Sequence, residues 1–153
     1  MRRLDSLPAS YCERYSNVQA AVGLAGLNHL DEWTRATKRH AELLNGALAD
    51  YKGTPRVPPE CEHVYYQFSV YVPDHTDFVR RALRHGIDVE TLHMDVCPRL
   101  PLFNDSASPA PGADLTTMAV QLPVYASLSD RDVLRIADVA RTILGREPLA
   151  RAA

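Results

Sequence analysis

Lysine is scarce in this chain. Only two of the 17 basic residues are lysines, namely Lys38 and Lys52. Any chemistry that needs a reactive amine therefore has two candidates. Cysteine is also rare, and Cys12, Cys61 and Cys97 are too irregularly spaced for a disulfide framework or for paired zinc knuckles. This usage fits a reducing compartment, and we expect the protein to be cytoplasmic.

Long apolar runs and an excess of one charge are missing as well. No stretch approaches the ~18 consecutive apolar residues that a membrane span needs, and the first residues have no apolar core of a signal peptide. The formal net charge is -2 and the basic residues are scattered, so neither nucleic acid nor a membrane is an expected partner. With 46% hydrophobic and 24% charged residues among 153, the composition is that of one folded domain.

The first third of the chain predicts a long helix after an irregular N-terminal segment. Residues 1–15 show no periodicity, whereas residues 16–50 follow a helical pattern that opens on the capping box Ser-Asn-Val-Gln. This pattern exceeds the length of a typical globular helix, so we expect a bend between Asn28 and Asp31. We interpret residues 16–50 as a connecting helix.

Residues 51–145 alternate between strand and helix patterns and predict a small α+β domain. Three strand patterns and two helix patterns follow in the order β-α-β-β-α, at residues 63–72, 74–85, 87–94, 118–125 and 129–144. The proline-rich stretch 98–116 predicts a long loop, and residues 146–153 predict a flexible tail. The fold class is therefore α+β, with a small antiparallel or mixed sheet of about three strands and helices on one face. With the leading helix the order is α-β-α-β-β-α.

Motifs for acid/base or nucleotide chemistry are absent. There is no Gly-x-Ser-x-Gly elbow and no glycine-rich phosphate loop, and most of the histidines are expected at helix surfaces or strand ends. His93, Asp95 and Cys97 would share one strand face if the strand extends that far, and all three are zinc-competent residue types. Their spacing matches no known zinc signature and Pro98 ends the strand at once. We therefore interpret them as polar residues beside a loop and predict no metal site.

Four collinear segments resemble one family. Residues 14–27 (RYSNVQAAVGLAGL) resemble the RxSNxQAAxGLAQL helix of the DegT/DnrJ/StrS family of pyridoxal-phosphate-dependent sugar aminotransferases. Residues 63–72, 78–89 and 121–130 are similar to its HxYxxFxV, FxxxLxxxGIxV and LPLYPxLTD segments. The resemblance covers residues 11–144, which is nearly the whole chain.

This resemblance implies only part of an enzyme. The family has the type I fold of pyridoxal-phosphate enzymes, in which a large N-terminal domain holds the cofactor and a small C-terminal α+β domain completes the site. The chain resembles the small domain with its connecting helix. The family's Schiff-base lysine precedes the RxSN helix, so neither Lys38 nor Lys52 matches it by position. We expect a partial aminotransferase for nucleotide-linked keto sugars that neither catalyses nor binds pyridoxal phosphate alone.

The resemblance also implies which residues approach the site. Arg14 falls at the edge of the partner subunit's cofactor site, but Cys12 stands where the family has an asparagine that reaches the cofactor phosphate. A thiol is a poorer phosphate ligand than an amide. The loop that approaches the sugar nucleotide in the family corresponds to the segment with His93, Asp95 and Arg99. Alternatively, these three residues belong to a solvated loop without a role in binding. No residue is assigned a catalytic role.

Three functions remain open at this point. Residues 18–27 are apolar in nearly every direction and are expected to be buried on most sides. Their partner would be a second copy of the chain, giving a homo-oligomer, or a separate large aminotransferase domain. A non-catalytic dimerisation or interaction module derived from the family is the alternative to a partial aminotransferase. A small metal-dependent enzyme using His93, Asp95 and Cys97 is the third hypothesis.

Overall fold

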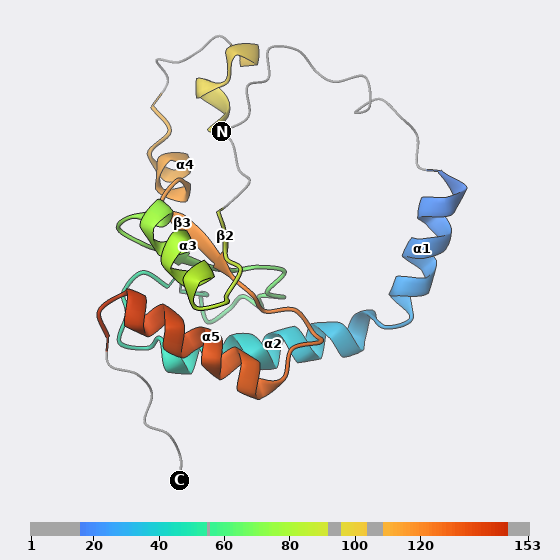
Figure 1. Ribbon diagram of the computed structural model, residues 1–153. Helices are drawn as coiled ribbons and strands as arrows, with labels where there is room; N and C mark the ends of the chain where they lie inside the picture. Colours follow the sequence, from blue (N-terminus) through green and yellow to red (C-terminus); the bar gives the residue numbers. More distant parts are fainter. Residues whose placement is uncertain (1–15, 55, 92–95, 104–108, 147–153) are drawn as a thin grey trace.

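The computed structural model of the chain describes residues 16–54, 56–91, 96–103 and 109–146. The elements are α1 (Asn17–Leu27), α2 (Leu30–Ala47), β1 (Phe68–Tyr71), α3 (His75–Arg84), β2 (Glu90–Thr91), α4 (Pro111–Thr116), β3 (Ala119–Leu122) and α5 (Asp130–Ile143) (Figure 1). The predicted order is confirmed, with the leading helix divided in two and the short helix α4 added before β3.

The three strands form one antiparallel sheet in the order β1-β3-β2, so β3 is the central strand. Ser69 of β1 and Glu90 of β2 both pair with Gln121 of β3, which places these three side chains in one row on the same face. Val70 and Val120, one position along, face the other way and are fully buried. The sheet therefore has a polar face and an apolar face, and the predicted α+β class is confirmed.

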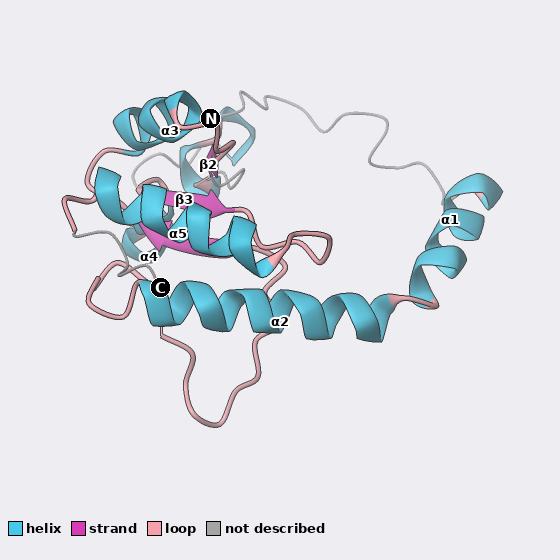
Figure 2. Cartoon of the chain, turned by 60° about the horizontal axis from the view of Figure 1, so that its bottom comes forward, coloured by secondary structure: helices cyan, strands magenta, loops and turns pink. Residues whose placement is uncertain are grey.

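Helices α2, α3 and α5 enclose the core on the apolar face of the sheet (Figure 2). Helices α2 and α5 lie side by side, and α3 contacts both α5 and the sheet. The core includes side chains from both helices and strands, among them Leu44, Leu48, Val70, Phe78, Val120, Val133, Ile136 and Ala140. Each fully buried large aliphatic or aromatic side chain contributes about 1.5–3 kcal/mol to folding.

Local sequence signals set the ends of α3 and α5. Asp74 caps α3 by accepting a hydrogen bond from a backbone N–H of the first turn, and Gly86 follows the helix with a φ of 73°. Ser129 and Asp132 form a reciprocal capping box at the start of α5, and Gly145 follows that helix with a φ of 69°. Positive φ favours glycine at both C-terminal positions. Both helices therefore begin and end where the sequence predicts.

The strand predicted over residues 63–72 is shorter, because only Phe68–Tyr71 pair with β3. Tyr65 has a φ of 51°, a left-handed conformation that cannot continue a strand. Its N–H donates a hydrogen bond to Nδ1 of His63 at 2.9 Å, which closes a local turn. As a result Tyr66 is 87% exposed, and the prediction was wrong for the first half of this segment.

The other two strands are also shorter than predicted. Glu90–Thr91 are the paired residues of the predicted strand 87–94, whose last residues lie outside the described part of the chain. In the predicted strand 118–125, pairing covers Ala119–Leu122 and stops before Pro123, which has no N–H to donate.

The stretch 98–116, predicted as a loop, contains short helical turns. Cys97–Arg99 and Pro101–Phe103 are 3-10 turns, and Pro111–Thr116 is α4. Proline is favourable at the first helical position because its N–H would be unpaired there in any case. The prediction of a wholly irregular loop was therefore wrong for the residues that the structure describes.

The predicted long helix bends at Asn28 and His29, which separate α1 from α2. This position agrees with the predicted bend. The capping box at the start of α1 is also present, with Ser16 and Gln19 bonding to each other's backbone N–H at 3.2 and 2.8 Å.

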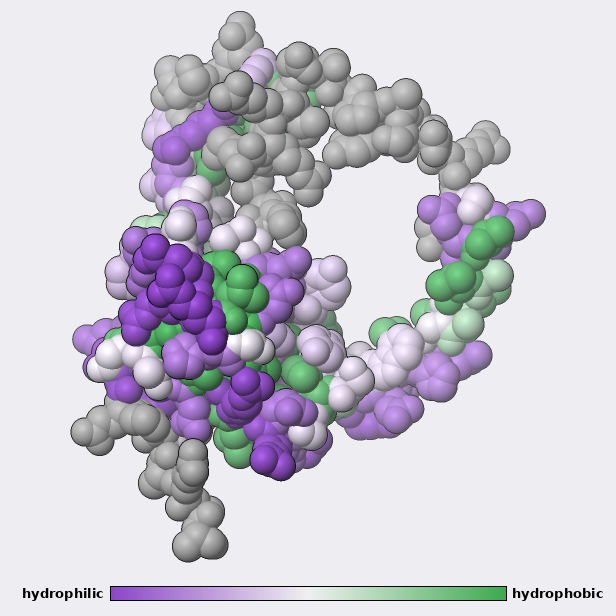
Figure 3. All heavy atoms as spheres, in the orientation of Figure 1, coloured by the Kyte–Doolittle hydropathy of each residue, from purple (hydrophilic) through white to green (hydrophobic). Residues whose placement is uncertain are grey.

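The apolar side chains of α1 are exposed, contrary to the expectation that they are buried on most sides. Val18, Val22, Leu24 and Leu27 keep 61–74% of their surface exposed. Helix α1 stands apart from the sheet and from the other helices (Figures 1 and 2), and its apolar side chains are open to solvent (Figure 3). No described residue of the chain buries this helix.

Candidate functional site

Of the residues predicted to approach a cofactor or a substrate, the structure describes Arg99. Arg14, His93 and Asp95 lie outside the described residues, as does Cys12. The grouping of His93 and Asp95 with Arg99 therefore remains a prediction.

Arg99 ends a 3-10 turn that is anchored on both sides. Val96 and Leu100 are buried, and the N–H of Arg99 donates to the carbonyl oxygen of Val96 at 2.8 Å. Nη2 of Arg99 lies 2.6 Å from Oδ1 of Asp114 in the first turn of α4, and 51% of the arginine side chain is exposed. A guanidinium has five N–H donors in a planar fork. The ion pair with Asp114 therefore positions Arg99 and leaves donors for an anionic group such as a phosphate.

Neither lysine fits the role of the amine that pyridoxal phosphate requires. Lys38 of α2 forms an ion pair with Glu62, and 27% of its side chain is exposed. The hydrogen bond from Lys38 holds the pKa of the Glu62 carboxyl below its usual value. Lys52 is exposed in the turn after α2. The described residues alone do not fit the cofactor, so no catalytic step is assigned to them.

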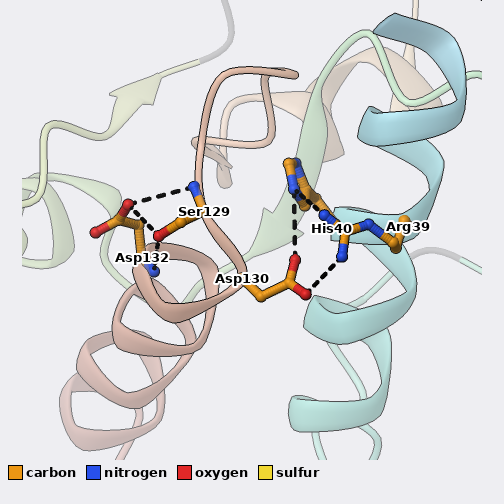
Figure 4. Close-up of polar contacts among 5 residues, drawn as sticks. All are labelled: Arg39, His40, Ser129, Asp130 and Asp132. Carbon is orange, nitrogen blue, oxygen red and sulfur yellow. Dashed lines mark hydrogen bonds and ion pairs between the residues drawn. The ribbon is translucent and has the colours of Figure 1, made fainter. Parts of the chain in front are cut away.

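A buried histidine makes a polar contact between α2 and α5 (Figure 4). The side chain of His40 has no exposed surface, and its Nε2 lies 3.7 Å from Oδ1 of Asp130, the first residue of α5. The other carboxylate oxygen of Asp130 accepts a hydrogen bond from Nη1 of Arg39 at 2.5 Å. Ser129, which lies nearby, donates its hydroxyl to Asp132 as part of the helix cap. Because the hydroxyl of Ser129 is bonded to Asp132, these residues do not form a catalytic triad. We call the contacts of Asp130 with Arg39 and His40 the clasp between α2 and α5.

His40 is an exception to the expectation that most of the histidines lie at helix surfaces or strand ends. It stands four residues before Leu44 and seven after Trp33, on the apolar stripe of α2. That spacing is the signal that could have identified it as buried.

The shifted pKa values among the described carboxyl groups are all lowered. The hydrogen bond from Arg141 is the main cause at Asp50, and the hydrogen bond from Arg80 is the main cause at Asp77. The hydroxyl of Ser129 lowers the pKa of Asp132. Carboxylates held ionised in this way are ion-pair and cap partners, whereas a general acid at neutral pH needs a raised pKa.

The described part of the chain contains neither a candidate membrane-spanning helix nor a candidate metal site. None of its helices combines the length and apolarity of a membrane-spanning segment. No group of three or more histidine, cysteine, aspartate or glutamate residues could hold a metal ion among the residues that were placed.

Comparison with known proteins gives the family. The model of the DegT/DnrJ/EryC1/StrS aminotransferase family matches residues 2–141. A curated relative, named pleiotropic regulatory protein, from Geobacillus stearothermophilus, is 30% identical over 81 residues, which is 50% of this chain and 22% of the relative.

Three solved structures share the fold. A DegT DnrJ EryC1 StrS aminotransferase from Brucella abortus has a TM-score of 0.70 and 26% identity over 87% of this chain and 37% of its own. DesI, solved in the presence of its TDP-sugar product, has a TM-score of 0.72 and 20% identity over 84% of this chain and 35% of its own. The PLP-form of a putative sugar aminotransferase, Spr1654 from Streptococcus pneumoniae, has a TM-score of 0.70 and 16% identity over 86% of this chain and 36% of its own.

The chain therefore spans little more than a third of the length of these solved proteins. Because the family model matches nearly all of its residues, this chain belongs to the DegT/DnrJ/EryC1/StrS aminotransferase family.

Proposed function

We propose that the chain is the C-terminal part of a cytoplasmic, pyridoxal-phosphate-dependent aminotransferase that acts on nucleotide-linked keto sugars. The observation that carries this proposal is that the family model matches residues 2–141 although the chain covers only 37% of a solved family member. In addition, neither of its lysines fits the Schiff base. A separate large domain supplies the lysine and the cofactor, which provides the electron sink for transamination.

The exposed apolar side chains of α1 support docking of such a domain. Val18, Val22, Leu24 and Leu27 are exposed on different sides of a helix that no described part of the chain covers. Exposed apolar surface of this kind marks protein interfaces. We assign α1 as the docking helix for the large domain.

The role of this chain in the assembled enzyme is to hold the anionic end of the substrate. Arg99 is the described residue with the chemistry for it, because a guanidinium matches phosphate oxygens and Asp114 fixes its position. That a relative, DesI, was solved with a TDP-sugar product agrees with a nucleotide-linked substrate.

The test is reconstitution with the separately expressed large domain of a solved relative. The full chain is mixed with that domain and pyridoxal phosphate, and transamination of a TDP-linked keto sugar is followed with a panel of amino acids as donors. We expect activity above that of the large domain alone. No gain at any ratio would refute the proposal.

Matched arginine variants then test the assigned residue. Arg99→Gln should raise the KM for the keto sugar about tenfold, the scale of one hydrogen bond to a charged group. Arg56→Gln removes an exposed arginine outside the loop and should leave KM unchanged. Equal effects of the two substitutions would remove Arg99 from the site.

The exposure of α1 also favours a second candidate, a non-catalytic dimerisation module. In that case the exposed apolar side chains of α1 contact a second copy of the chain. Sedimentation of the full chain should then show a dimer that Leu24→Ser weakens, whereas Leu83→Ser, at a similarly exposed leucine on α3, should not. A monodisperse monomer at high concentration would rule this candidate out.

A further inference from the structure

Two adjoining hollows form a groove where the chain leaves β3. One hollow, of about 310 Å³, lies over Gln121 on the polar face of the sheet. The other, of about 600 Å³, lies beside Arg135 of α5 and the turn that follows α3. Three residues line both hollows and join them, namely Asp88, Pro123 and Tyr125.

The groove is acidic. Its lining includes three acidic side chains, those of Asp88, Glu90 and Asp132, and the basic side chain of Arg135. Nη2 of Arg135 already donates a hydrogen bond to the carbonyl oxygen of His85 at 2.8 Å. Asp88 is exposed and forms no ion pair with a described residue. The lining therefore favours a cationic ligand.

Two exposed tyrosines add to this preference. Tyr66 is 87% exposed and Tyr125 is 57% exposed, and both line the hollow over Gln121. The faces of aromatic rings attract guanidinium and ammonium groups. Exposed tyrosine is also a common contact residue for polypeptides.

Gln121 has a buried hydrogen-bond donor that no described residue of the chain pairs with. It is 7% exposed, and its Nε2 has no hydrogen-bond partner among the residues that the structure places. A buried donor without a partner is costly, so its presence indicates a partner that is missing from the free chain. A carboxamide offers one acceptor and one donor group, which matches the C=O and N–H of an extended main chain.

We propose that this groove binds an extended polypeptide segment that carries arginine or lysine. Gln121 pairs with the main chain of the segment, Asp88 receives the basic side chain, and Tyr66 and Tyr125 pack against its stem. The two hollows in succession suit an extended chain, whereas a single small amine would occupy one of them. This binding activity is independent of the aminotransferase function and uses none of Arg99, Asp114 or α1.

Fluorescence anisotropy of the full chain tests the proposal. The probe is a fluorescein-labelled nonapeptide of alternating serine and arginine, compared with the same peptide carrying glutamate in place of arginine. We expect the arginine peptide to bind and the glutamate peptide not to bind. Asp88→Asn should weaken binding about tenfold, whereas Asp31→Asn, the same charge change at an exposed position on α2, should not weaken it.

Gln121→Met separates binding from folding. It keeps the size of the side chain and removes the unpaired donor, so the melting temperature of the free chain should stay equal or rise while peptide affinity falls about tenfold. A role in folding alone would lower both together or leave affinity unchanged, and either result overturns the proposal.

Two other outcomes would also overturn it. If Asp31→Asn weakens binding as much as Asp88→Asn does, the peptide is held by general charge attraction. If free arginine displaces the peptide at an equal concentration of arginine residues, the site takes a small cation and not an extended segment.

Discussion

Arg141 of α5 and Asp50, in the turn after α2, form a two-point ion pair, with Nη1 at 2.6 Å from Oδ1 and Nη2 at 3.3 Å from Oδ2. Nη1 of Arg141 also donates to the carbonyl oxygen of Ala47, the last residue of α2, at 2.6 Å. The arginine side chain is 12% exposed. It therefore satisfies a carbonyl that the end of α2 leaves unpaired, and it joins the ends of the two helices.

We expect Arg141→Met to lower the free energy of unfolding by about 1–3 kcal/mol, because it keeps the apolar stem but leaves the partly buried carbonyl oxygen of Ala47 without its donor. Urea unfolding followed by circular dichroism measures the loss. Arg131→Met, at an exposed arginine of the same helix, is the control and should be nearly neutral. Equal stability of the two variants would contradict the role given to Arg141.

Acid should destabilise the fold through its paired carboxylates. The pKa values of Asp50, Glu62, Asp77 and Asp132 are lowered in the folded chain, chiefly by hydrogen bonds from Arg141, Lys38, Arg80 and Ser129 respectively. A carboxyl group whose pKa is lower in the folded chain than in the unfolded chain stabilises the fold. This contribution is complete at a pH above the unfolded pKa of about 4, and it is lost as the pH falls through the lower pKa of the folded chain.

The melting temperature should therefore fall as the pH decreases from about 5 to 3. Asp50→Asn removes one of these titrating groups, so this variant should start less stable and lose less over the same range. Thermal unfolding at half-unit pH steps measures both slopes. A melting temperature that rises on acidification would contradict the assignment.

Features that depend on neighbours in the sequence could be predicted. The ends of α3 and α5 follow from Asp74, Gly86, Ser129 and Gly145, whose backbone and capping preferences act within one turn. Period-two and helical patterns were likewise enough for the α+β class with three strands. These elements need no information from distant parts of the chain.

Features set by distant contacts could not be predicted. The alternation over 63–72 favours a strand, but Tyr65 takes a left-handed conformation whose ring packs on Phe68 and whose hydroxyl accepts a hydrogen bond from Asn45 of α2 at 3.2 Å. The apolar composition of α1 predicts burial without saying which molecule provides the surface. The ion pair between Arg99 and Asp114 depends on α4, which no periodic pattern indicated.

Two glycines should respond to alanine in opposite directions. Gly53 lies against the edge of β1, where its carbonyl oxygen accepts the N–H of Tyr71 at 2.8 Å, and a Cβ there would overlap the ring of Tyr51 and the carbonyl oxygen of Tyr71. Gly46 in α2 has nothing within 4 Å of an added Cβ. We expect Gly53→Ala to cost about 1–3 kcal/mol and Gly46→Ala to stabilise by about 0.5–1 kcal/mol. A urea midpoint of Gly53→Ala that is unchanged or raised would show that the contact at Gly53 is not restrictive.

The clasp between α2 and α5 should depend on the buried histidine more than on the exposed arginine beside it. His40→Ala removes a fully buried ring and should cost about 2 kcal/mol or more, whereas Arg39→Ala removes an exposed ion pair and should cost at most about 0.5 kcal/mol. Urea unfolding of both variants measures the two losses. If they are equal, the ion pair of Asp130 with Arg39 holds the helices together. A larger loss for His40→Ala would show that packing of the buried ring holds α2 against α5.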